Sequence, residues 1–277
     1  MSGTYSIKKS QEVQLPAKEE VLERARKIFS DPNARIEPSV SCVSEDPVIV
    51  LELLKAVHSI EAAGSRVPIT TPRACIQRLG NQLINETLEM ISERPQLTDP
   101  GVAEWYDKYR SYSYQVSKIA SIICDIKRIR YADECKVAAL FTYLGDMLSV
   151  AYLQQDYVVQ ADAASRKRLN YRLTQDYGFN PEDAGIEYLK AYGIPDVLLF
   201  PLERSTAPKD KNYAIMRPIC NAAQEIYEAN MNGKLEKYAP NTDLPSNSAL
   251  RLLQLNAPQL VRMHNQIAEY LAPNSTK

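Results

Sequence analysis

The sequence is poor in histidine and glycine. Its 277 residues include two histidines, His58 and His264, and nine glycines. A Ser-His-Asp or Cys-His device would have to use one of these two histidines, which lie far apart in the sequence. We interpret both as structural residues on amphipathic helices. The glycine-rich loops that cradle phosphates and the G-x-S-x-G turn of serine hydrolases are also missing, so the sequence predicts no catalytic residue of these kinds.

Cysteine is scarce and scattered. The five cysteines include no C-x-x-C pair, and such spacing fits neither a zinc cluster nor a disulfide framework. We expect them to be small apolar residues on helix faces in a reducing compartment. They are Cys42, Cys75, Cys124, Cys135 and Cys220.

Charge is nearly balanced, with 33 basic and 34 acidic residues and a net charge of −1. Because nucleic-acid binding usually requires a basic surplus, we expect no nucleic-acid partner. Two short basic clusters, residues 127–130 and 166–168, are interpreted as solvated helix faces. No apolar run approaches a membrane span, and residues 1–10 lack the apolar core of a signal peptide, so we expect a cytoplasmic protein.

The prolines indicate where helices begin. Four of them follow a residue whose side chain can cap a helix, and proline at the first helical position gives up an amide that has no partner there. Each such pair therefore predicts a helix start. The pairs are Asp46-Pro47, Thr71-Pro72, Asp99-Pro100 and Asn180-Pro181.

Apolar residues recur at helical spacing along most of the chain, and no alternating run predicts a strand. The expected fold class is therefore all-α. Long helices are predicted over 102–129 and 133–153, and Gly80 is a candidate helix C-cap. Turn-rich stretches at 92–101 and 233–247 predict loops. Later helices are predicted over 161–177, 181–192, 195–204, 213–232 and 248–271.

Two segments of the first half carry a family resemblance. Residues 44–59 have an Asp-Pro helix start and a Leu-Leu pair, and they end in His58-Ser59. Residues 68–80 form a second signature that ends in Leu-Gly. Together with Leu15-Pro16, these segments resemble HDOD domains, although His58 stands where that family typically has asparagine.

The second half resembles the part that HDOD domains share with HD-superfamily phosphohydrolases, whose His and Asp side chains hold catalytic metals. Here Ser111 stands at the first histidine of that pattern, and Thr142 and Tyr143 stand at the His-Asp pair. Gly145 is kept, and Asp146 replaces a residue that is usually basic. The resemblance covers about residues 13–205 and departs from the family pattern at each metal ligand.

This departure implies that the metal site is lost. Imidazole-free ligand sets do not hold transition metals tightly, so we expect no metal and no cofactor. A carboxylate site for a hard cation, using Asp125, Asp146 or Asp183, is an alternative that the spacing does not favour.

The residues that replace the ligands mark a vestigial pocket: Ser111, Thr142, Tyr143 and Asp146. We favour the interpretation in which Tyr143 and several tyrosines of one helix fill this pocket with aromatic side chains. In the alternative, the same hydroxyls line a site for a small molecule or a peptide. The helix tyrosines are Tyr106, Tyr109, Tyr112 and Tyr114.

We therefore expect two packed helical subdomains, residues 1–96 and 97–205, followed by a helical extension over 206–277. The resemblance implies a bacterial, non-catalytic module that transmits a signal through contacts with a protein partner. The alternative function is a metal-dependent phosphohydrolase with non-standard ligands that acts on a nucleotide or another phosphodiester.

Overall fold

The computed structural model describes residues 6–61, 68–161, 165–203 and 206–272, and within these ranges it contains helices and no strand. The all-α prediction is confirmed. The chain forms two compact units. Unit 1 consists of Met1–Tyr114 and Tyr143–Pro195, and unit 2 of Gln115–Thr142 and Asp196–Lys277. The subdomain boundaries expected after residues 96 and 205 stay predictions, and residue 205 lies outside the described ranges.

All four helix starts predicted from proline are confirmed. The helices are α4 (Pro47–Glu61), α5 (Pro72–Ser92), α6 (Pro100–Lys127) and α11 (Pro181–Ala191). In each case the preceding side chain accepts a hydrogen bond from a backbone amide of the first turn, at 2.7 to 3.3 Å. The capping residues are Asp46, Thr71, Asp99 and Asn180.

The single helix predicted over 133–153 is wrong, because the chain turns at Phe141–Tyr143. Helix α7 (Ala132–Leu140) ends there and α8 (Leu144–Leu153) begins. The amides of Phe141 and Thr142 donate to carbonyls three residues back, at 3.1 and 3.2 Å, which tightens the turn. Tyr143 then leaves helical geometry, with φ −106° and ψ 14°. The break falls at the residues that replace the His-Asp pair.

Among the described residues, one segment, Ala132–Leu153, has the length and apolar composition of a membrane span. Within its most apolar 18-residue window, 78% is buried inside the protein. Such burial is typical of the core helices of soluble proteins. The cytoplasmic location stays a prediction.

Helix α5 contains the expected break at Gly80. This residue has φ 71° and interrupts the helix, as a capping glycine would. The chain then resumes the helix directly and continues to Ser92, so Gly80 kinks α5 rather than ending it.

The later helices are shorter than predicted. The last one is divided into η3 (Ala249–Leu253) and α14 (Ala257–Leu271), because Asn256 and Gln259 form a capping box at the start of α14. The segment predicted over 195–204 has one helical turn among its described residues, and Arg204 lies outside them. The remaining later helices are α9 (Gln155–Ala161), α10 (Arg166–Tyr177), α12 (Asp196–Leu199), η1 (Lys211–Ile215), α13 (Met216–Met231) and η2 (Leu235–Tyr238).

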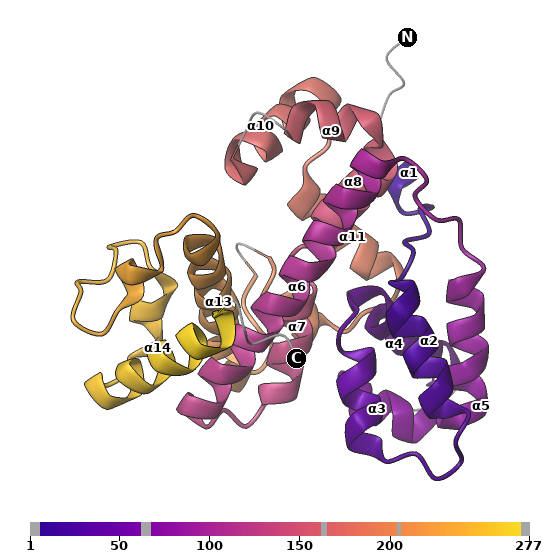
Figure 1. The fold of residues 1–277 in the computed structure, drawn as a ribbon, viewed down its shortest axis with the longest axis horizontal. Helices are drawn as coiled ribbons and strands as arrows, with labels where there is room; N and C mark the ends of the chain where they lie inside the picture. The colour runs from indigo at the N-terminus through magenta and orange to yellow at the C-terminus, as the bar shows by residue number, and fades with distance from the viewer. Residues whose placement is uncertain (1–5, 62–67, 162–164, 204–205, 273–277) are drawn as a thin grey trace. The chain divides into compact units, whose positions relative to one another are not determined.

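In unit 1, α2 (Glu19–Phe29) and α3 (Ile36–Val43) pack with α4 and α5 into one bundle (Figure 1). The short helix α1 (Ile7–Ser10) packs against α11 and α8 instead. The helices of the bundle bury apolar faces against one another, and this burial is the main stabilising contribution in such a fold.

An extended segment, residues 13–18, joins α1 to α2 and is bonded to side chains of distant elements. We call this segment the strap. Leu15 of the strap is fully buried, so the polar groups of its backbone need partners inside the protein. Tyr188 donates to Val13 O, Arg94 to Leu15 O, Tyr106 and Arg110 to Pro16 O, and Lys18 N donates to Asp46, all at 2.8 to 3.0 Å.

Two buried ion pairs support the strap. Arg94 Nη2 lies 2.8 Å from Glu52 Oε1, and Arg110 Nε lies 3.3 Å from Asp46 Oδ2. Asp46 therefore caps α4, accepts from the strap and neutralises Arg110. One carboxylate connects three elements of unit 1.

Two glycines allow α8 and α11 to cross at close range. A methyl group added to Gly145 would lie 1.9 Å from Pro181 O, and one added to Gly185 would lie 2.8 Å from Gly145 Cα. No real contact is that short, so the backbones touch only because both residues lack a side chain. This explains why Gly145 is kept although its neighbours have lost the ligand pattern.

In unit 2, α7 packs against α12 and α13, and η3 packs against α13. The Glu225 carboxylate accepts hydrogen bonds of 3.0 Å from Ala249 N, which fixes the start of η3. Cys124, Cys135 and Cys220 are buried in this unit as free thiols. With Cys42 and Cys75 also buried in unit 1, the prediction of apolar core cysteines is confirmed.

The helix crossing generates one prediction. Replacing Gly145 or Gly185 with alanine should lower the free energy of unfolding by about 3 kcal/mol or more, because backbone cannot move aside as a side chain can. Gly101→Ala is the matched control, since its new methyl group would meet side-chain atoms at 3.4 Å and beyond. Urea unfolding followed by circular dichroism measures all three variants. Equal midpoints for Gly101→Ala and Gly145→Ala would contradict the close crossing.

A second prediction concerns Asp46. Asp46→Ala should cost about 3–5 kcal/mol of unfolding free energy, because it leaves the buried Arg110 guanidinium without its buried counter-ion. Asp107 also pairs with Arg110, at 2.6 Å, but its side chain is exposed. Asp107→Ala should therefore cost less than about 1 kcal/mol. The same unfolding experiment compares the two, and similar losses would show that the strap does not depend on Asp46.

Candidate functional site

A bidentate ion pair joins α8 to α10 near the residues that replace the His-Asp motif. The Asp146 side chain in the first turn of α8 is 1% exposed, and the Arg166 side chain at the start of α10 is 22% exposed. Arg166 Nε donates to Asp146 Oδ1 at 3.1 Å, and Nη2 donates to Oδ2 at 2.8 Å. Such fork-to-fork pairs are among the strongest ion pairs in proteins. A cation from the protein itself thus neutralises the buried carboxylate.

Aromatic side chains cover this ion pair. The guanidinium carbon of Arg166 lies 4.7 Å from the ring centre of Tyr143, within the range of a cation–π contact. The Tyr143 ring stacks on Tyr109, with ring centres 5.9 Å apart and planes inclined by 29°. Tyr112 meets both rings edge-on, at 5.6 and 5.8 Å. Tyr157 OH donates to Tyr109 OH at 2.7 Å.

The pKa values of Tyr109 and Tyr157 in this cluster are raised, which favours the protonated phenols. Burial, together with the Asp146 carboxylate, raises the pKa of Tyr109 far above its ordinary value. Burial also raises the pKa of Tyr157, and its neighbour Tyr109 adds to that shift. Neutral phenols are poor metal ligands and poor nucleophiles, so these hydroxyls hold the cluster together through hydrogen bonds.

The structure brings together two of the four residues of the predicted vestigial pocket. Tyr143 and Asp146 are both buried and both contact Arg166. Ser111 is exposed on α6, and Thr142 is half-buried in unit 2. The Thr142 Oγ1 atom is buried without a hydrogen-bond partner among the described residues. A ligand-binding role for the four residues stays a prediction.

Of the five tyrosines in the packing interpretation, three join the cluster. Tyr109, Tyr112 and Tyr143 pack together as that interpretation expects. Tyr106 instead bonds the strap through Pro16 O. Aromatic side chains therefore occupy the surroundings of Asp146.

Sequence reasoning missed Arg166. The cluster 166–168 was expected to be a solvated face, which holds for the exposed Lys167 and Arg168 and is wrong for Arg166. A signal was present, because Asp146 is an acid in the strongly apolar segment of α8 and must be compensated when that segment is buried. The sequence does not show which distant cation reaches it.

The carboxylate alternative for a hard cation lacks its ligands. Asp125 and Asp183 are exposed, whereas Asp146 is buried against Arg166. Within the described ranges, no group of three or more His, Cys, Asp or Glu side chains is placed to hold a metal. His58 Nε2 lies 2.8 Å from Ile69 O, which supports its structural interpretation.

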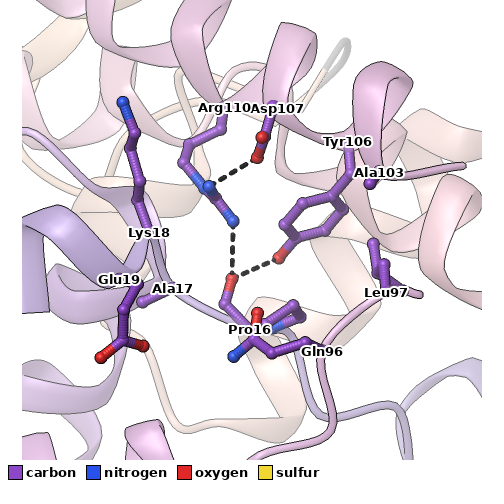
Figure 2. Close-up of a pocket in the computed structure, with 10 residues that line it drawn as sticks. All are labelled: Pro16, Ala17, Lys18, Glu19, Gln96, Leu97, Ala103, Tyr106, Asp107 and Arg110. Carbon is purple, nitrogen blue, oxygen red and sulfur yellow. Dashed lines mark hydrogen bonds and ion pairs between the residues drawn. The ribbon is translucent and has the colours of Figure 1, made fainter. Parts of the chain in front are cut away.

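A cavity of about 230 Å³ opens beside the strap, away from the Asp146–Arg166 pair (Figure 2). Figure 2 shows Tyr106 and Arg110 meeting at the Pro16 carbonyl, with Asp107 on the guanidinium. Arg110 Nη1 and Nη2 therefore already donate to Asp107 and to the Pro16 carbonyl. The charges around this cavity are of both signs, with Lys18 and Glu19 at its wall.

Comparisons with solved structures show the same fold. The MmoQ response regulator of Methylococcus capsulatus str. Bath matches with a TM-score of 0.67 at 14% identity, covering 90% of this chain and 94% of that chain. A second MmoQ structure matches with a TM-score of 0.65 at 16% identity, covering 87% of this chain and 98% of that chain. A virulence factor of Campylobacter jejuni subsp. jejuni gives 0.60 at 18% identity, covering 90% and 96%.

The sequence comparisons give a family. No curated protein matches the chain. The family model of the HDOD domain matches residues 15–208, which is more than half of the sequence. This range agrees with the resemblance expected over about residues 13–205. The chain belongs to the HDOD domain family.

Proposed function

We propose that the chain is a non-catalytic regulatory module that acts through contacts with a protein partner. The observation that carries this proposal is the Asp146–Arg166 pair beneath the ring of Tyr143. Arg166 therefore supplies a cation beside Tyr143, which stands at a former ligand position, and pairs with Asp146, which stands where the family usually has a basic residue. The fold is related to that of hydrolases, whereas the residues around Asp146 pack like those of a protein core.

Replacement of this pair by a metal ion would be costly. The ion would have to displace a guanidinium that makes three hydrogen-bond contacts with Asp146. It would then find one carboxylate and neutral phenols, whereas catalytic metal sites use at least three deprotonated or imidazole donors. The displaced guanidinium would also lose its partner in a largely buried position.

The relatives support a regulatory role in a bacterial cell. The proteins with the same fold come from bacteria, and MmoQ is called a response regulator. A regulatory protein without catalytic activity transmits its signal through a surface that binds another protein. We therefore expect a protein partner, no bound cofactor and a cytoplasmic location.

One prediction tests the absence of catalysis. Purified protein should hold far less than one equivalent of transition metal by mass spectrometry, and it should not hydrolyse bis(4-nitrophenyl) phosphate in the presence of manganese. Turnover that rises with manganese and tracks a stoichiometric metal content would overturn the proposal in favour of a phosphohydrolase.

A further prediction concerns the ion pair itself. Arg166→Ala should lower the free energy of unfolding by about 3 kcal/mol, because Asp146 would remain buried without a counter-ion. Arg166→Lys keeps the positive charge but cannot form the bidentate pair. Its free energy of unfolding should therefore lie between those of Arg166→Ala and the wild type.

The control is Lys167→Ala, which changes the exposed neighbour on the same helix. This change should stay within about 0.5 kcal/mol of the wild type in urea unfolding. If Arg166→Ala is as stable as Lys167→Ala, the pair does not hold α8 to α10.

A further inference from the structure

A groove of about 310 Å³ lies between α4 and α5 in unit 1. Its walls carry three apolar side chains that remain accessible to solvent: Ile60 (46% exposed), Leu83 (38%) and Met90 (57%). The two helices pack against each other. Exposed large apolar residues that gather along one groove are typical of a protein-binding surface.

The spacing of these residues suits a helical partner. Leu83 and Met90 are seven residues apart on α5, which corresponds to about 10 Å along a helix axis. Ile60 faces them from α4 across the groove. An amphipathic helix that lies in such a groove presents anchors at positions i, i+3 or i+4, and i+7.

One rim of the groove is acidic. Glu86 lines the groove, and Glu89 on α5 and Glu93 at the C-cap of α5 follow it at helical spacing. All three are exposed, and none takes part in an ion pair within the described residues. Glu86 accepts a hydrogen bond from Gln82 Nε2 at 3.0 Å, which leaves its charge uncompensated.

The opposite wall does not cancel this charge. Lys55 of α4 is the basic residue of the groove, and its ammonium lies 3.8 Å from Glu52 and 4.2 Å from the centre of the Tyr192 ring. Lys55 is therefore already engaged on its own side. A partner would meet an apolar floor with negative charge along one edge.

We propose that this groove docks an amphipathic helix of a partner protein that carries apolar anchors and a row of Lys or Arg residues. The anchors cover Ile60, Leu83 and Met90, and the basic row faces the three glutamates. This assignment rests on the proposed function and names the surface and the class of partner that it requires. Anionic lipid is disfavoured by the same glutamates, and a second copy of the chain would bring its own acidic rim to the contact.

The test uses two labelled 18-residue helical peptides with one stripe of leucines, flanked by lysines in one peptide and by glutamates in the other. Fluorescence anisotropy measures their binding to the full chain. The lysine peptide should bind at least about tenfold more tightly than the glutamate peptide, and its affinity should fall as salt rises. Equal affinity for both peptides, or no binding, would overturn the proposal.

Two methionines supply a matched pair of variants. Met90→Gln removes an apolar anchor from the groove without adding a charge, and Met231→Gln makes the same change at a similarly exposed position (51%) on α13 of unit 2. Met90→Gln should weaken binding of the lysine peptide at least about tenfold, whereas Met231→Gln should leave it unchanged. Equal effects of the two variants would rule out this groove.

A charge reversal provides a second readout that does not touch the apolar positions. The triple variant E86K/E89K/E93K should prefer the glutamate peptide, because all three side chains are exposed and should change without unfolding the protein. An unchanged preference would contradict the role of the acidic rim. Light scattering that finds a dimer which Met90→Gln dissociates would assign the groove to a second copy instead.

The two proposals fail in different experiments. If the lysine peptide does not bind preferentially, and the protein holds no metal and hydrolyses no phosphodiester, the docking groove is rejected and the regulatory role is retained. Manganese-dependent hydrolysis by the same preparation removes the regulatory role whatever the peptides do.

Discussion

The structure around the residues that replace the His-Asp pair depends on one interaction, the bidentate pair of Asp146 and Arg166. An ionised carboxylate in the core is stable only with a charge of opposite sign beside it. The guanidinium supplies that charge, is itself shielded by the Tyr143 ring and holds α10 against α8. The guanidinium thus already balances the charge of the buried Asp146 carboxylate.

A second buried network shows the same logic in the rest of unit 1. The strap has no helix to satisfy its backbone, so side chains from α6, α11 and the α5–α6 connection bond its carbonyls. Asp46 completes the network by capping α4 and pairing with Arg110. These bonds join the backbone of the strap to the rest of unit 1. On the exterior of unit 1, the groove between α4 and α5 combines apolar side chains with uncompensated acidic residues.

The sequence predicts helices well where the signal is local. Side-chain caps before proline act within three residues, and all four of these helix starts are correct. The break at Phe141–Tyr143 was not predictable in this way, because no proline marks it and the modestly lower helix propensity of Phe, Thr and Tyr does not by itself end a helix. Arg166 was missed for a similar reason, since its partner is 20 residues away and the pairing depends on how α8 and α10 pack. The family pattern drew attention to Tyr143 and Asp146, and the packing of the helices determined that Arg166 contacts both.

The central proposal is that the guanidinium of Arg166, paired with Asp146 beside Tyr143, leaves this part of the protein without a bound metal ion. A crystal structure of the protein grown with excess manganese, with anomalous data collected at the manganese edge, tests this claim most directly. The account predicts no anomalous peak near Asp146 and an Arg166 fork that still spans both carboxylate oxygens. A manganese ion bound to Asp146, with Arg166 turned away into solvent, would contradict it.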